Sequence, residues 1–216
     1  MLFVDSTDPK EIKDLFAWGV ASGVTTNPLI FARESGGADL EGRIKEVLAV
    51  SEGHVSVELV CEDEAGMLEE AAGYAAWDPK RICIKVPFGE TGLRVTHQLT
   101  KQGVATNVTC MMSFNQAYLA ALAGGTYISI FSGRVRDTGY DVRPTIRQTR
   151  EQLDREGLAS QIIIGSVRHM MDVNDSLAAG AHIVTVPPPL LRKMLHHPKT
   201  DEVIAQFNAA WKNRGA

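Results

Sequence analysis

Eight short apolar runs, rich in β-branched residues, recur along the 216 residues of this chain and alternate with segments whose apolar residues follow helical spacing. Strands that alternate with helices are typical of parallel βα units. Eight such units predict an α/β fold, the closed (β/α)8 or TIM barrel, near the short end of its usual length. The expected strands are residues 2–4, 23–25, 55–58, 81–87, 104–108, 127–131, 162–165 and 183–186.

A doubly wound open sheet is the structural alternative to the barrel. That fold usually carries a glycine-rich phosphate-binding turn directly after its first strand. Here residues 5–9, which read Asp-Ser-Thr-Asp-Pro, follow the first strand and contain no glycine. We therefore expect one barrel domain over residues 1–216. An additional C-terminal helix at 200–213, capped by Thr200 and apolar along one face, is surplus to the eight units, which leaves it to pack either on its own barrel or on a neighbouring subunit.

Charge and composition disfavour several classes of partner. The net charge is −4 and no long basic run is present, so we expect no nucleic acid and no membrane as partners. No apolar run approaches the ~20 residues of a membrane span, and the first residues resemble a strand rather than a leader. Three cysteines without a CxxC pair favour the cytoplasm, and six histidines without metal-binding spacing predict no metal site.

Lys85 lies inside the apolar strand expected at 81–87. A lysine is rarely buried unless a partner compensates its charge. Burial also favours the neutral amine, which is a nucleophile that can attack a carbonyl group. Pairing with a carboxylate, or exposure of the amine at the strand end, is the structural alternative. Lys85 is therefore a candidate Schiff-base residue, and the rest of the chain decides between the two interpretations.

Polar residues follow most of the predicted strands, and the carboxyl ends of the strands are where (β/α)8 barrels carry out their chemistry. Asp5 and Glu58 supply carboxylates there. The neutral candidates at other strand ends are Asn27, Asn107, Thr109 and Ser129. Such a set around a lysine suits a Schiff base and a polyhydroxylated substrate.

Two arginines and a serine after the sixth and seventh strands are candidates for phosphate binding. Arg134 lies in a polar segment, residues 132–141, that we expect to be a loop, whereas Ser166 and Arg168 follow the seventh strand. Arginine offers forked donors that match phosphate oxygens. The usual phosphate site of such barrels lies after strands seven and eight, which agrees for Ser166 and Arg168.

Residues 23–28 (Gly-Val-Thr-Thr-Asn-Pro) and 82–87 (Ile-Cys-Ile-Lys-Val-Pro) resemble two signature segments of the transaldolase family, in particular its small single-domain members. Residues 55–58, 106–109, 129–134 and 197–202 are similar to further family segments. The resemblance covers nearly the whole chain and implies the same barrel as the strand pattern. Small members form pentameric rings that pair into decamers, so the resemblance also implies a homo-oligomer, either a pentamer or a decamer.

The resemblance implies an enzyme acting on sugar-phosphate substrates. Lys85 would form an imine with the C2 ketone of a ketose phosphate, such as fructose 6-phosphate or sedoheptulose 7-phosphate. Glu58 and Thr109 would move protons through a bound water, and Asp5 would take the C4 hydroxyl proton as the C3–C4 bond breaks. The dihydroxyacetone unit would pass to an aldose phosphate with no metal or organic cofactor, because the protonated imine is the electron sink. The implied substrate-binding residues are Thr26, Asn27, Asn107, Ser129, Phe131, Arg134, Ser166 and Arg168.

Several alternatives stay open. A fructose-6-phosphate aldolase shares the barrel and the lysine, but the aldolases carry Gln and Tyr where this chain has Glu58 and Phe131. Another alternative is a related transaldolase that acts on a modified sugar, for example a sulfonated one. It stays open because Leu29, Ile130 and Ser132 depart from the usual family residues beside the site. The Thr-Thr-Asn-Pro segment argues against a deoxyribose-phosphate aldolase. The retained lysine and carboxylates argue against a barrel that only binds or assembles.

Overall fold

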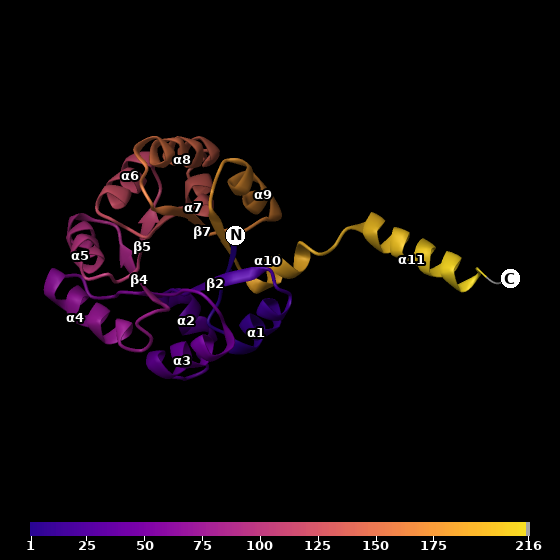
Figure 1. Ribbon diagram of the computed structural model, residues 1–216, viewed down its shortest axis with the longest axis horizontal. Helices are drawn as coiled ribbons and strands as arrows, with labels where there is room; N and C mark the ends of the chain where they lie inside the picture. Colours follow the sequence, from indigo (N-terminus) through magenta and orange to yellow (C-terminus); the bar gives the residue numbers. More distant parts are fainter. Residues whose placement is uncertain (215–216) are drawn as a thin grey trace.

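The computed structural model describes residues 1–214, in which eight parallel strands close into a barrel in sequence order (Figure 1). β8 pairs with β1 and closes the ring. This confirms the predicted (β/α)8 barrel, while residues 215–216 of the domain predicted over 1–216 lie outside the described residues. The strands are β1 (Leu2–Asp5), β2 (Ala21–Thr25), β3 (Val55–Glu58), β4 (Ile82–Pro87), β5 (Thr106–Met111), β6 (Tyr127–Phe131), β7 (Gln161–Gly165) and β8 (Ile183–Val186).

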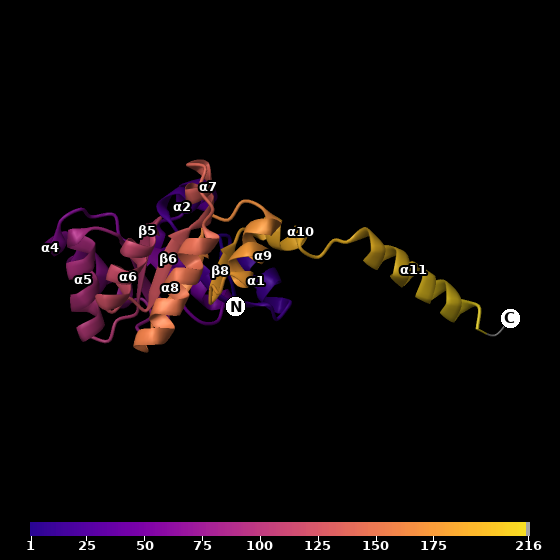
Figure 2. The ribbon, with the colours of Figure 1, turned by 90° about the horizontal axis from the view of Figure 1, so that it is seen from above.

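Helices surround the strands, and the last helix extends away from the barrel (Figures 1 and 2). Several begin at a side chain that caps the first turn, such as Asp8 and Asp39. Within residues 1–214, no helix combines the length and apolar character needed to cross a membrane. The helices are α1 (Pro9–Ala17), α2 (Pro28–Glu34), α3 (Leu40–Val50), α4 (Glu64–Ala75), α5 (Glu90–Lys101), α6 (Phe114–Leu122), α7 (Ser132–Asp137), α8 (Arg143–Glu156), α9 (Met170–Ala178), α10 (Pro188–Lys193) and α11 (Pro198–Lys212).

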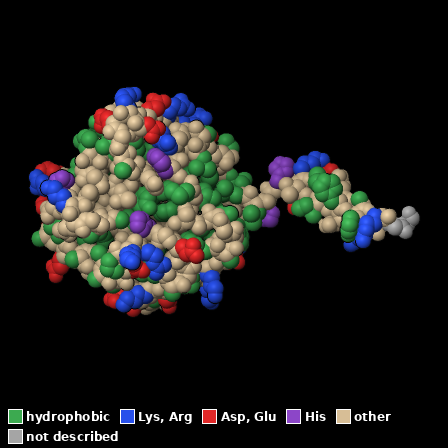
Figure 3. Space-filling view, viewed as in Figure 1, with side chains coloured by type: hydrophobic (Ala, Val, Ile, Leu, Met, Phe, Trp, Pro, Cys, Tyr) green, Lys and Arg blue, Asp and Glu red, His purple; other side chains and the backbone are tan. Residues whose placement is uncertain are grey.

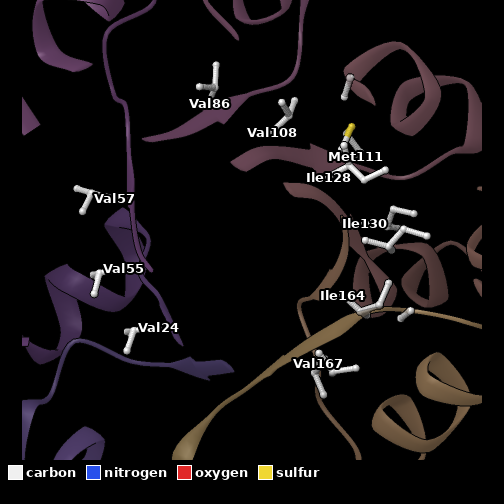
Figure 4. Close-up of a cluster of buried hydrophobic side chains, with 14 of the residues drawn as sticks. Val24, Val55, Val57, Val86, Val108, Met111, Ile128, Ile130, Ile164 and Val167 are labelled. Carbon is white, nitrogen blue, oxygen red and sulfur yellow. The ribbon is translucent and has the colours of Figure 1, made fainter. Parts of the chain in front are cut away.

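The two faces of the strands carry different side chains. Valine and isoleucine on the outer face pack under the helices and form the main core; Figure 4 shows Val57, Val86 and Ile130 among them, directed away from the barrel centre. A second, smaller apolar cluster alternates with this set along the strands and therefore lies on the inner face. Its members are Phe3, Cys83, Tyr127, Ile163 and Ile183.

The inner face becomes polar toward the carboxyl ends of the strands. Because side chains of a strand point to the same face every second residue, each member of the inner apolar cluster is followed two positions later by another inward residue. Those residues are Asp5, Lys85, Ser129, Gly165 and Thr185, and all five line one cavity. The strand pattern thus places a polar site directly above an apolar floor.

The polar end of the barrel is the end that carries α2 and α7, opposite the end where Met1 lies (Figure 2). Strand register determines which polar residues are neighbours there. Asp5 stands beside Thr25, and Lys85 stands between Glu58 and Asn107. The lysine is therefore flanked by a carboxylate on one strand and an amide on the other.

The largest differences between the structure and the sequence prediction are three local features, beyond shifts of one or two residues at the ends of β1, β2, β4 and β7. The prediction of a loop over 132–141 is wrong for its first six residues, which form α7. That short helix has little apolar sequence signal, because among its side chains only Val135 is a buried hydrophobic residue. The fifth strand runs over Thr106–Met111 rather than 104–108. The last helix begins at Pro198, with His197 at the N-cap position instead of Thr200.

Candidate active site

Lys85 is held in the barrel mouth by two oxygen atoms. Its side chain comes from β4, and the residue is only 4% exposed. The amine Nζ lies 2.8 Å from the Glu58 carboxylate and donates to the backbone carbonyl of Thr26 over 3.0 Å. The carboxylate compensates the charge of the buried ammonium, so the pairing that the sequence offered as the structural alternative for Lys85 is present. The same contacts also hold the nitrogen at the cavity, because Lys85 lines it.

Asp5 occupies the same cavity from the end of β1. The Thr25 hydroxyl donates to Asp5 Oδ1 over 2.8 Å, and the Thr25 and Thr185 hydroxyl oxygens are 2.5 Å apart. Burial raises the pKa of Asp5, while the charge of Lys85 and the Thr25 hydrogen bond act in the opposite direction. A carboxylate with a raised pKa binds a proton more readily, so Asp5 has the properties of a general base.

The cavity between these residues has a volume of about 30 Å³. A much larger open hollow of about 760 Å³ adjoins it, and the two share Asp5 and Asn27. The site thus consists of a narrow cavity at the lysine and a wide hollow lined by residues of α1, α2 and α10. The lining residues of the small cavity are Asp5, Thr25, Asn27, Lys85, Asn107, Ser129, Phe131, Gly165, Ser166 and Thr185.

Buried polar atoms on β5 are left for a ligand or water. Asn107 donates through Nδ2 to the Ser56 hydroxyl over 3.2 Å. Within the described part of the chain, Asn107 Oδ1 and Thr109 Oγ1 are buried and have no hydrogen-bond partner. Because buried polar atoms are normally satisfied, both atoms have unused capacity to bind a polar group.

Residues 26 and 27 connect β2 to the site through different atoms. Asn27 Oδ1 caps α2 by accepting from the Ile30 N–H over 2.9 Å, so its amide nitrogen is the group available in the cavity. The Thr26 hydroxyl donates to the Ser56 carbonyl over 2.7 Å. Thr26 reaches the site with its backbone carbonyl, which accepts from Lys85.

The two arginines predicted to bind phosphate come together around a shared aspartate, but neither lines the small cavity or the adjoining hollow. The Arg168 guanidinium makes two hydrogen bonds to the Asp137 carboxylate, and Arg134 lies 4.0 Å from the same carboxylate. Ser166 lines the small cavity and has a left-handed backbone, with φ of 57°. Gly133 lets α7 approach this turn, because a Cβ there would lie 2.2 Å from the Ser166 carbonyl oxygen.

Most of the residues predicted from sequence gather around the cavity. Seven line it, namely Asp5, Asn27, Lys85, Asn107, Ser129, Phe131 and Ser166. Glu58 and Thr26 reach it through Lys85, and Thr109 is buried on β5. Arg134 and Arg168 meet at Asp137 and do not line the cavity. Sequence reasoning missed Ser56, which contacts both Thr26 and Asn107. Its signal was the alternation in Val-Ser-Val-Glu, which places residues 56 and 58 on one face.

Metal binding has no geometric support in the described residues. Across residues 1–214, no group of three or more histidine, cysteine, aspartate or glutamate side chains could hold a metal ion. The cavity and its surroundings present an amine, two carboxylates and several neutral hydrogen-bonding groups.

The fold and the site define a class of (β/α)8 barrel with a lysine at the centre of the strand ends. The chain matches the transaldolase/fructose-6-phosphate aldolase family over residues 2–215. It is 42% identical over 211 residues to a probable transaldolase of Alkaliphilus metalliredigens, covering 98% of this chain and 97% of that protein. A probable transaldolase of Desulforamulus reducens is 43% identical, covering 98% and 96%. Probable transaldolase 2 of Listeria monocytogenes is 40% identical, covering 97% and 95%.

This chain belongs to the transaldolase/fructose-6-phosphate aldolase family. The resemblance seen in the sequence segments is thereby confirmed.

Proposed function

We propose that this protein is a transaldolase that moves a dihydroxyacetone unit from a ketose phosphate to an aldose phosphate through a Schiff base on Lys85. The observation that carries this proposal is the placement of a buried lysine amine, 2.8 Å from the Glu58 carboxylate, in the same cavity as Asp5. The family membership and the similarity to probable transaldolases support it. The three free cysteines fit a cytoplasmic enzyme.

Imine formation begins when Glu58, 2.8 Å from the nitrogen, takes a proton from the Lys85 ammonium, and the resulting amine attacks the C2 carbonyl of the donor. Glu58 gives that proton to the carbonyl oxygen, which becomes the carbinolamine hydroxyl. Glu58 then takes a second proton from the carbinolamine nitrogen and delivers it to the hydroxyl, which leaves as water, and the protonated imine remains. Thr109, whose hydroxyl is buried and unpartnered within residues 1–214, helps to hold the water that relays this proton.

Cleavage of the C3–C4 bond follows once the imine is protonated. Asp5 accepts the proton of the C4 hydroxyl, the C4–O bond becomes a carbonyl, and the C3–C4 electron pair moves into the iminium to form an enamine. The aldose phosphate leaves, and an acceptor aldose phosphate replaces it. Attack of the enamine carbon on the acceptor carbonyl forms the new bond, and Asp5 returns its proton to the new hydroxyl.

Arg134 and Arg168, with Ser166, are proposed to bind the substrate phosphate. Replacing either arginine with alanine is expected to raise KM for a phosphorylated donor roughly 10- to 100-fold, because a hydrogen bond to a charged group contributes roughly 1.5–3 kcal/mol. Arg143→Ala is the matched control, since Arg143 is an exposed arginine that also pairs with an aspartate, Asp141. An unchanged KM in both Arg134→Ala and Arg168→Ala would show that these arginines do not bind the phosphate.

Transfer, rather than release of the three-carbon unit, requires that water does not hydrolyse the intermediate before the acceptor arrives. Phe131 lines the cavity with an apolar ring, so it holds no hydrolytic water there. With fructose 6-phosphate alone, we expect slow appearance of dihydroxyacetone. Adding erythrose 4-phosphate should give rapid formation of sedoheptulose 7-phosphate and glyceraldehyde 3-phosphate.

The variant that tests the balance between transfer and release is Phe131→Tyr, which adds only a hydroxyl. We expect it to increase release of dihydroxyacetone relative to transfer. If the wild-type protein releases dihydroxyacetone as fast without an acceptor as it transfers with one, the fructose-6-phosphate aldolase alternative is the better description.

A homo-oligomer is proposed because α11 buries none of its own residues. Hydrophobic side chains lie exposed along it (Figure 3), including Ile204, Phe207 and Trp211. A helix of this length is marginal in water without a packing partner, so we propose that it packs on a second copy of the chain. Light scattering should give an oligomeric mass that falls in a Phe207→Asp, Trp211→Asp variant but not in Asn208→Asp. A monomeric wild-type protein would refute the proposal.

A further inference from the structure

Glu34, the last residue of α2, binds the segment that directly follows Asp5. Its Oε2 atom accepts from the Ser6 hydroxyl over 2.8 Å, from the Thr7 N–H over 2.8 Å and from the Thr7 hydroxyl over 3.3 Å. Ser6 and Thr7 are almost completely buried, and Ser6 Oγ in turn accepts from the Asp8 N–H. One carboxylate oxygen therefore organises the whole turn between β1 and α1.

The position of Glu34 in α2 connects two parts of the site. The same helix begins after Asn27, which lines the catalytic cavity, and ends at Glu34, which lines the adjoining hollow together with Asp5. Because Asp5 is the last residue of β1, its backbone direction depends on the turn that follows it. A single rigid helix thus carries a cavity residue at one end and the anchor of the Asp5 turn at the other.

We propose that Glu34 is a positioning residue, which holds the turn after Asp5 so that the Asp5 carboxylate faces the C4 hydroxyl. The negative charge of Glu34 also keeps Asp5 an effective proton acceptor. This inference rests on the proposed function, in which Asp5 takes the C4 proton. Glu34 itself touches neither Lys85 nor the small cavity, so its effect passes through Asp5.

Electrostatics supports the same role. Burial is the main cause of the raised pKa of Asp5; Lys85 from β4 and Arg33 from α2 lower it, and Glu34 raises it. Burial acts to raise the pKa of Glu34, but hydrogen bonds from Arg33, Thr7 and Ser6 hold it below its ordinary value, so Glu34 is ionised when Asp5 is. The remaining charged residues of the hollow are Asp8 and Glu11 near α1 and Arg192 on α10.

The first test is Glu34→Gln, which keeps an acceptor oxygen for the turn and removes the charge. We expect kcat for transfer to fall roughly three- to tenfold with little change in KM, because the base is weaker and less well oriented. The acidic limb of the kcat/KM pH profile should move to lower pH, since Asp5 then loses its proton more easily. Glu41→Gln, an exposed carboxylate paired with Lys45 on α3, is the matched control and should leave both unchanged.

The second test is Arg33→Gln, which leaves the hydrogen bonds of Glu34 to the turn intact. Removing this positive charge should move the acidic limb the other way, to higher pH. Opposite shifts in two folded variants are not expected from a purely structural role, which would lower the melting temperature and leave the limb in place. An acidic limb that stays in place in either folded variant overturns the inference.

Failure of this inference is distinguishable from failure of the proposed function. If the wild-type protein forms no Lys85 adduct with a ketose phosphate, the proposed function itself is wrong. If the wild type transfers and Asp5→Asn does not, while Glu34→Gln matches the wild type in kcat and in its pH profile, only the role of Glu34 is wrong.

Discussion

Replacing Lys85 with methionine is expected to reduce the transfer rate roughly a thousandfold or more, because the variant has no amine to form the imine. Methionine preserves much of the length of the side chain but leaves the Glu58 carboxylate without its 2.8 Å partner. The measurement is borohydride reduction in the presence of fructose 6-phosphate, followed by peptide mass spectrometry. The wild-type protein should carry the reduced adduct on Lys85, and the variant should carry none.

The matched control for this experiment is Lys80→Met, because Lys80 is an exposed lysine just before the same strand. It should keep both transfer and the adduct. An adduct on a different lysine, or none with any ketose phosphate, would show that the mechanism does not run through Lys85.

The Asp5→Asn variant is expected to lose transfer by a factor on the order of 10²–10⁴, the usual contribution of a general base. Asparagine can still accept the hydrogen bond from Thr25, which is 2.8 Å long in the wild type, so the geometry should be largely retained. Imine formation depends on Lys85 and Glu58 rather than on Asp5, and borohydride should therefore still trap the donor. A variant that transfers at the wild-type rate would exclude Asp5 as the proton acceptor.

The raised pKa of Asp5 predicts how the activity of the wild-type protein and the stability gained in Asp5→Asn depend on pH. Asp5 must be ionised to act, so wild-type activity should fall as the pH decreases through a value above the ordinary range of aspartate. Because the raised pKa means that the ionised form is less favourable in the folded state than in the unfolded state, Asp5 lowers stability progressively as the pH rises from the unfolded-state pKa to the folded pKa, and the full loss is present above the folded pKa. Asp5→Asn should then raise the melting temperature at neutral pH, and no such gain is expected in acid.

Local sequence patterns were sufficient to predict the barrel and the centre of its site. Eight apolar runs with helical segments between them indicate parallel βα units, and strand ends are then the place for chemistry. Lys85 and Asp5 were identifiable because a polar residue in an inward position of an apolar strand is unusual. Ser129 was predicted as a polar residue near a strand end, whereas Phe131 was implied by the family resemblance.

Short polar elements were not predictable in the same way. The segment that forms α7 has few apolar residues, so no helical periodicity separates it from a loop. Its geometry depends on the close approach of Gly133 to the Ser166 carbonyl, which is a contact between α7 and the turn after β7. The pairing of Arg134 and Arg168 through Asp137 arises from the same approach.

Residue spacing within single elements was enough to predict the eight βα units along the chain, the face on which each strand residue lies, and the strand ends that carry a lysine or a carboxylate. Which residues meet follows from the packed fold: Glu58 lies 2.8 Å from Lys85, Thr185 lies beside Thr25, and Glu34 binds the turn after Asp5. These contacts depend on register, barrel closure and the direction of α2. Those are properties of strands and helices packed together, and no spacing within one segment encodes them.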